Sequence, residues 1–187
     1  IVLPVKGPQK VLDNLMEFGG FPEPYLKQDK RFSNRWKKLR YDQLFKEDMR
    51  DLSRIQDIGQ LEVLAELLRG QSGQLVNYST LAVKISKSVD SVKKWIEVLG
   101  LFYYCFTLRP WTKNVPRSLI KEPKVFLWDW SLVSDKGARF ENLLAVHLFK
   151  AVQIWTDAGL GDYQLFFIRD KEKREVDFVV TKDGRPW

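Results

Sequence analysis

The chain has 187 residues, with 31 Lys and Arg residues against 24 Asp and Glu residues and a formal net charge of +7. A hydrophobic fraction of 44% is ordinary for a globular protein and excludes wholesale disorder. The single cysteine excludes a disulfide framework within the chain, and the single histidine excludes metal sites that need several imidazoles.

The length fits one large domain or two small ones. Because the first residue is Ile1 rather than methionine, we expect the chain to be a piece of a longer polypeptide. The uncharged stretch in its apolar middle, residues 98–108, is too short to span a bilayer, so no membrane association is expected. Nothing in the cysteine content indicates an oxidising compartment, and we expect a cytoplasmic location.

The first part of the chain, residues 1–56, predicts a helical connector. Residues 9–18 carry four apolar side chains on one helical face, and two Gly and two Pro within residues 19–24 end that helix. From about Ser33 to Leu52, apolar residues again recur at helical spacing. Basic residues line this second helix, and a solvated helix face is sufficient to explain them.

Residues 57–130 predict three short helices and then two strands. The helices are expected over residues 58–68, 77–85 and 88–99, with Ser88 capping the third and Gly100 ending it. Aromatic, uncharged residues 101–108 favour a strand, and residues 124–128 favour a second one. This is the order of a winged helix, and the short polar break before the third helix suits a helix-turn-helix.

The basic surplus is concentrated in this middle part, since residues 84–124 hold nine basic side chains against three acidic ones. In a helix-turn-helix the third helix enters the major groove, and the hairpin lies on the DNA backbone. The third helix carries no arginine, so phosphate contact is favoured over base readout, and a protein-binding winged helix stays open as an alternative. The expected DNA contacts are Lys87, Ser91, Lys93, Lys94, Lys113 and Arg117.

Residues 131–187 predict a helix over 137–150, a strand over 163–168 and a second strand over 174–181. In the second strand alternation places Val176, Phe178 and Val180 on one face and Glu175 and Asp177 on the other.

Carboxylates held on a rigid strand and on a facing helix are how nucleases hold a divalent metal such as Mg²⁺. The acidic residues of this strand could supply one such carboxylate. A half-solvated edge strand explains the same acidic spacing.

Several short motifs follow one another along the chain. They are Gly19-Gly20-Phe21-Pro22, the segment from Phe45 to Asp51, Asp129, Gly137-x-Arg139-x-Glu141-Asn142, and Arg169 followed by Glu175-Val176-Asp177-Phe178. Their order and spacing resemble the C-terminal part of prokaryotic AAA+-type ATP-binding proteins of unknown function, which carry a winged helix and then a domain related to PD-(D/E)XK nucleases. The resemblance covers nearly the whole chain.

The resemblance implies an α/β architecture in three parts. Residues 1–56 would connect to an ATPase lid, residues 57–130 would form the winged helix, and residues 131–187 would form a nuclease-like domain that is incomplete at its C-terminus. ATP would bind only in a preceding domain, because this chain has no Gly-x-x-x-x-Gly-Lys-Ser/Thr motif.

In the nuclease-like fold, Glu141 on the helix and Asp177 on the strand match the first two site positions, which makes them the implied catalytic residues and Mg²⁺ ligands, and a Glu-x-Lys strand would follow Trp187. Without that strand the site would lack a third carboxylate and a lysine, so hydrolysis by this chain alone is not expected.

Three functions stay open. The first is a DNA-associated accessory module whose partner is the rest of the same polypeptide, and the second is a metal-dependent nuclease in the full-length protein. The third is a protein-interaction or oligomerisation module without nucleic acid, with exposed Trp36, Trp111 and Trp155 as contacts.

Overall fold

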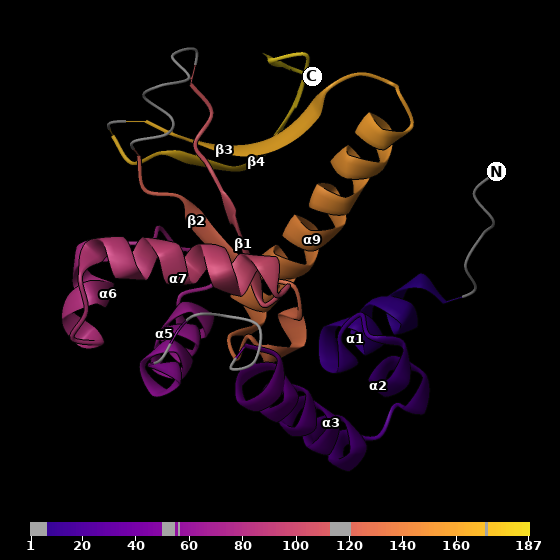
Figure 1. Ribbon diagram of the computed structural model, residues 1–187. Coiled ribbons are helices and arrows are strands. Elements are labelled where there is room, and N and C mark those ends of the chain that lie inside the picture. Colours follow the sequence, from indigo (N-terminus) through magenta and orange to yellow (C-terminus); the bar gives the residue numbers. More distant parts are fainter. Residues whose placement is uncertain (1–6, 50–54, 56, 113–120, 171) are drawn as a thin grey trace.

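The computed structural model describes residues 7–49, 55, 57–112, 121–170 and 172–187. Helices and two small antiparallel sheets are both present, so the expected α/β class is confirmed at that level (Figure 1). None of the helices in these ranges is both long and apolar enough to cross a membrane.

The N-terminal part consists of α1 (Pro8–Phe18), α2 (Pro22–Lys27) and α3 (Lys30–Gln43), continued by the π-helical turn η1 (Leu44–Asp48). The predicted end of the first helix is confirmed, with Gly19 at φ 81°. The Pro-rich segment after it starts a short helix of its own, because proline is well tolerated in a first helical turn. Phe45 and Met49 are fully buried and anchor this part to the middle of the chain.

Three further helices follow: α5 (Ile58–Gly70), α6 (Tyr78–Lys84) and α7 (Val89–Leu101). The predicted cap of α7 is confirmed, since Ser88 Oγ accepts a hydrogen bond from the Ser91 backbone N–H at 3.1 Å. The predicted stop at Gly100 is wrong. The chain reverses at Tyr103, which has φ 56°, and the backbone N–H groups of Tyr103 and Tyr104 close the last turn.

The strands β1 (Cys105–Leu108) and β2 (Lys124–Leu127) form an antiparallel hairpin whose two faces are both covered. One face packs on α5, α6 and α7, and the other packs on the C-terminal helix and sheet. The predicted DNA contacts of the hairpin, Lys113 and Arg117, lie outside the described residues. The buried side chains of the first face are Cys105, Val125 and Leu127, and those of the second are Phe106, Leu108 and Phe126.

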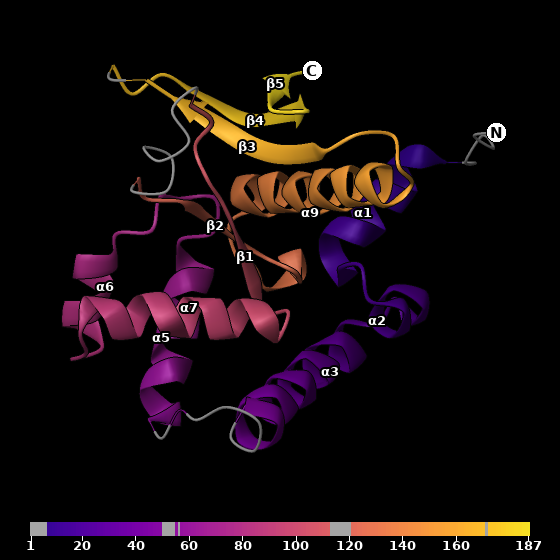
Figure 2. The same ribbon diagram turned by 45° about the horizontal axis from the view of Figure 1, so that its top comes forward.

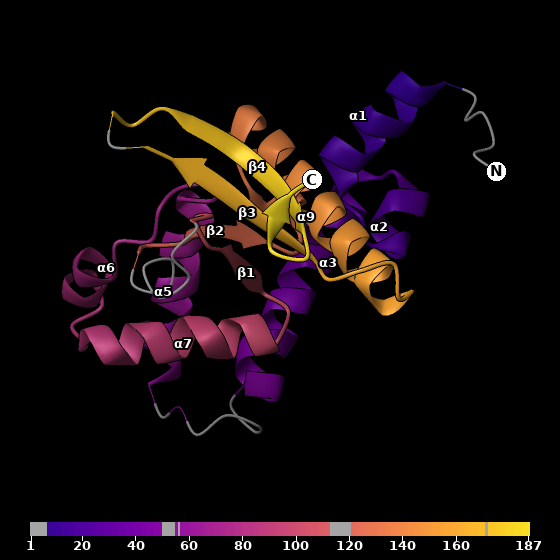
Figure 3. The ribbon, with the colours of Figure 1, turned by 90° about the horizontal axis from the view of Figure 1, so that it is seen from above.

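The C-terminal part contains the short η2 (Trp130–Leu132), the long helix α9 (Lys136–Asp157), and a sheet of β3 (Tyr163–Arg169), β4 (Glu175–Lys182) and β5 (Arg185–Pro186). The sheet covers one side of α9, as Figure 2 shows, and its strands cross over the helix when seen from above (Figure 3). Helix α9 exceeds the predicted range at its C-terminal end, and β5 was not predicted. The hairpin joins this sheet through a parallel bridge between Pro110 and Phe167.

Candidate functional site

Four charged side chains from three elements converge beside the hairpin. Lys124 begins β2, Glu141 lies on α9, and Glu175 and Asp177 lie on β4. The Lys124 Nζ atom is 3.1 Å from Glu141 Oε1, 2.5 Å from Glu175 Oε1 and 3.0 Å from Asp177 Oδ1. The lysine side chain is 3% exposed, whereas each carboxylate keeps contact with solvent. We call these four residues the Lys124 cluster.

A β-bulge in β4 orients its acidic residues toward Lys124. Ile168 pairs with Val176, but Phe166 pairs with Val179, so two residues of β4 face Phe167 alone. Asp177 and its neighbour Phe178 consequently both reach the same face of β2, where the Phe178 ring lies 5.9 Å from that of Phe126. The predicted alternation, which put these neighbours on opposite faces, is wrong at the bulge.

The electrostatics of the Lys124 cluster favour a charged lysine. Burial lowers the pKa of Lys124, but the hydrogen bonds that its ammonium group donates to Glu175, Asp177 and Glu141 outweigh burial and hold that pKa above its ordinary value. Burial also raises the pKa of Glu141, against the opposing effect of Lys124. Arg169 adds a second cation at the edge, with Nη1 3.2 Å from Glu175 Oε2.

The Lys124 cluster does not fit a divalent metal as it is arranged. Three carboxylates are suitable ligands for Mg²⁺, but their oxygens converge on a buried ammonium group rather than on an open point. In the described part of the chain, no group of three or more His, Cys, Asp or Glu side chains is placed to hold a metal ion.

The structure thus brings the predicted pair Glu141 and Asp177 together and adds a third carboxylate and a lysine from within the chain. Sequence reasoning missed Glu175 as a member, although it shares a strand face with Asp177 at a spacing of two. It also counted Lys124 only among the nine basic residues of the segment 84–124. No local signal could place that lysine, because its partners come from distant segments.

The predicted DNA contacts lie in different environments. Lys93 and Lys94 are exposed on α7, and the Lys93 ammonium lies 5.6 Å from the centroid of the Tyr78 ring. By contrast, Lys87 Nζ is 2.8 Å from Asp57 Oδ2, and Ser91 Oγ is 2.9 Å from Ser88 Oγ, so both are engaged within the protein. The remaining two, Lys113 and Arg117, lie outside the described residues.

The three tryptophans expected to be exposed are half-buried, and that expectation is wrong. The Trp36 indole N–H donates to the Glu23 carboxylate. Trp155 packs edge-on against Tyr163 and Trp187, with ring centroids 5.2 and 5.6 Å away. Trp111 is held through its backbone N–H, which donates to the Phe167 carbonyl at 2.7 Å.

Asp129 lies at the junction of the N-terminal helices with η2. Its Oδ1 accepts hydrogen bonds from the Ser131 backbone N–H at 3.0 Å and from the Ser131 hydroxyl at 2.6 Å. Burial raises the pKa of Asp129 in spite of these bonds and of Lys37 nearby. The Lys37 ammonium donates to the Ser131 carbonyl at 3.2 Å and so joins α3 to η2.

Comparison with known proteins supplies a family and no activity. The model of a domain of unknown function (DUF8612) matches residues 9–143, so the chain belongs to this family. An uncharacterized protein of Methanocaldococcus jannaschii, MJ1544, is 24% identical over 189 residues, which cover 94% of this chain and 40% of that protein. The chain therefore spans less than half the length of this curated relative. No solved structure matches the chain.

Proposed function

We propose that the chain is the C-terminal region of a cytoplasmic AAA+-type ATP-binding protein and acts as its DNA-associated accessory module. The order of α5, α6, α7 and the hairpin β1–β2 supports a winged helix, and α9 followed by β3 and β4 supports a partial nuclease-like domain. The rest of the same polypeptide, with its ATP site, is the expected partner. A relative much longer than this chain leaves room for such a domain.

The observation that carries the DNA proposal is the pair Lys93 and Lys94, exposed on α7 after a tight turn. In a helix-turn-helix this helix faces the major groove, where lysine ammonium groups contact phosphates without reading bases. Asp90 and Glu97 are also exposed on α7 and weaken its positive potential. Binding should therefore be weak, independent of sequence and sensitive to salt.

A salt titration of binding to duplex DNA, followed by fluorescence anisotropy, tests the proposal. Each phosphate contact adds about 0.9 to the slope of log K against log salt, so Lys93→Ala/Lys94→Ala should reduce the slope by about 2. The control Lys10→Ala/Lys136→Ala removes the same charge from exposed positions on α1 and α9 and should leave the slope unchanged. The proposal would be contradicted if the unchanged protein did not bind DNA at low salt. It would also be contradicted if both double variants reduced the slope of log K against log salt equally.

A metal-dependent nuclease in the full-length protein is the second candidate, and the convergence of three carboxylates at Lys124 favours it. The buried ammonium group argues against metal binding in the present arrangement. Incubating the full-length protein with plasmid DNA and Mg²⁺ tests this candidate. The candidate is supported if the unchanged protein cleaves DNA, Asp177→Ala abolishes cleavage, and the exposed control Glu172→Ala retains it. Absence of cleavage by the unchanged protein would exclude a nuclease.

A further inference from the structure

A second surface of the molecule combines aromatic rings with cations. A cleft of about 430 Å³ lies between the N-terminal helices, the turn after α7 and helix α9. This volume falls in the range of about 300–1,000 Å³ typical of ligand clefts. No carboxylate lines it among the described residues. The rings and cations on its walls are Phe21, Tyr103, Trp128, Trp130, Arg40 and Lys150.

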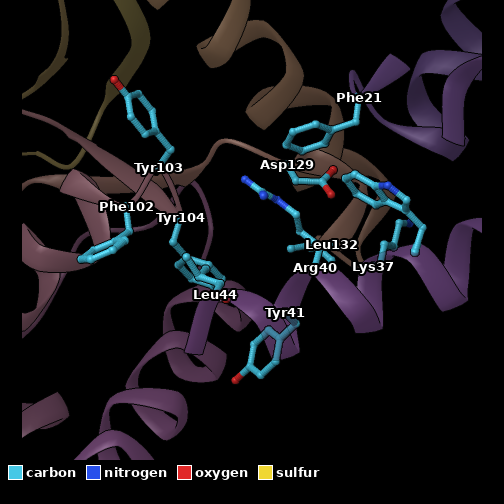
Figure 4. Close-up of a pocket in the computed structure, with 11 residues that line it drawn as sticks. Phe21, Lys37, Arg40, Tyr41, Leu44, Phe102, Tyr103, Tyr104, Asp129 and Leu132 are labelled. Carbon is cyan, nitrogen blue, oxygen red and sulfur yellow. The ribbon is translucent and has the colours of Figure 1, made fainter. Parts of the chain in front are cut away.

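A smaller hollow adjoins the cleft and shares Phe21, Arg40 and Tyr103 with it. Asp129 lines this hollow but not the cleft, and its carboxylate accepts hydrogen bonds from Ser131. Figure 4 shows the Arg40 side chain between Phe21 on one side and Tyr103 on the other. The Arg40 guanidinium lies 5.7 Å from the centroid of the Phe21 ring. Arg40 and Lys150 are both exposed, so the cleft presents positive charge beside aromatic faces.

Tyr103 is an unusual residue for its position. It has φ 56° at the end of α7, where glycine is the common choice, and a side chain there costs about 1 kcal/mol. Burial does not offset this cost, because the residue is 70% exposed. Its ring has one aromatic neighbour among the described residues, Trp128 at 5.8 Å between centroids. A strained backbone that presents an exposed aromatic ring at the rim of a cleft indicates a binding role.

The combination of groups selects the chemistry of the ligand. Flat aromatic faces stack on flat rings, and arginine and lysine attract phosphates, while the absence of a lining carboxylate among the described residues favours an anion. Bases inside a duplex are already stacked and cannot reach such a surface, whereas unpaired bases can.

We propose that this cleft binds single-stranded nucleic acid. Unpaired bases stack on Tyr103 and Trp128, and the adjoining phosphates contact Arg40 and Lys150. The cleft follows the last turn of α7, whereas Lys93 and Lys94 lie near the middle of that helix, so the inference does not rest on the duplex contacts proposed above.

Titration of labelled oligothymidylate, followed by anisotropy and by quenching of tryptophan fluorescence, tests the proposal. Tyr103→Gly removes the ring at a position where glycine suits the backbone, so the fold should be retained and Tm should not fall. One stacked base contributes about 1–3 kcal/mol, so Kd should rise about tenfold. The control Phe140→Ala removes an exposed ring of α9 outside the cleft and should leave Kd unchanged.

Arg40→Gln/Lys150→Gln should reduce the slope of log K against log salt by about 1.4 for a single strand. Equal Kd values for the unchanged protein and Tyr103→Gly, or no binding at low salt, would overturn the proposal. Two further probes would also overturn the proposal if they bound as tightly as the oligonucleotide. Tight binding of thymidine monophosphate would assign the cleft to a free nucleotide, and tight binding of an acidic tyrosine-containing peptide would assign it to a protein. Duplex binding is measured in parallel and should be unchanged in Tyr103→Gly, so the two proposals fail separately.

Discussion

Lys124 and Asp177 are 53 residues apart in the sequence, yet Nζ of the first lies 3.0 Å from Oδ1 of the second. This ion pair joins the hairpin to the C-terminal sheet. The same lysine is buried and also pairs with Glu141 and Glu175, so it is the cation that three carboxylates share.

Replacing Lys124 with methionine should destabilise the protein by about 3 kcal/mol, because three carboxylates then lose their shared cation at a partly buried position. Denaturant unfolding measures the free-energy difference. Lys136→Met, an exposed change on the same helix as Glu141, serves as the control and should have an effect below about 0.5 kcal/mol. Similar values for the two variants would show that the Lys124 cluster contributes little to stability.

The stabilisation from Lys124 should depend on pH in a defined direction. Its folded-state pKa is raised above the ordinary 10.5, so its contribution is complete below 10.5 and is lost as the pH rises through the folded value. In Lys124→Met this alkaline loss disappears.

The same variant should recover stability relative to the unchanged protein as Glu141 protonates in acid, because burial raises the pKa of Glu141 and its protonation removes one of the charges left without a cation. Unfolding free energies of both proteins across the pH range check this prediction. A difference between them that does not vary with pH would contradict it.

Asn142 should contribute more to stability than Ser72, one of its hydrogen-bond partners. The residue is fully buried, and its Oδ1 accepts from the Leu127 backbone N–H at 2.8 Å and from the Ser72 hydroxyl at 2.5 Å. Its Nδ2 donates to the Leu127 carbonyl at 2.6 Å. Asn142→Leu leaves these groups without partners and should cost about 3 kcal/mol by thermal or denaturant unfolding. Ser72→Ala removes one of these bonds and should cost about 1 kcal/mol; a larger loss for Ser72→Ala would refute this ranking.

Gly20 permits the close packing of the N-terminal segment on Trp130. A Cβ atom at Gly20 would lie 2.4 Å from Cη2 of the indole, so Gly20→Ala should destabilise the protein by about 1–3 kcal/mol and shift tryptophan fluorescence. Gly59, at the start of α5, has open space around its Cα, and Gly59→Ala should instead stabilise by about 0.5 kcal/mol. Unfolding curves of the two variants displaced in the same direction would contradict this explanation.

Local sequence signals predicted an element correctly where a single residue or a single periodicity determines its position. Ser88 was recognisable as a cap, and the apolar spacing of residues 58–68 was sufficient to predict α5. The predictions were wrong where distant contacts compete with local preference. Tyr103 takes the turn position expected of Gly100, and Pro22 begins a helix where only a break was expected.

The sequence by itself determined the α/β class, the order of the longer helices and of the strands β1 to β4, and the basic character of the middle segment, because these depend on composition and on spacings of a few residues. Only the tertiary structure decided which charges are available at the surface. Lys87 and Lys124 belong to that basic segment, yet the first pairs with Asp57 and the second is buried among Glu141, Glu175 and Asp177. An ion pair between distant segments and a bulge in β4 both depend on how separate strands pack against one another. The periodicity of residues along one strand carries no information about that packing.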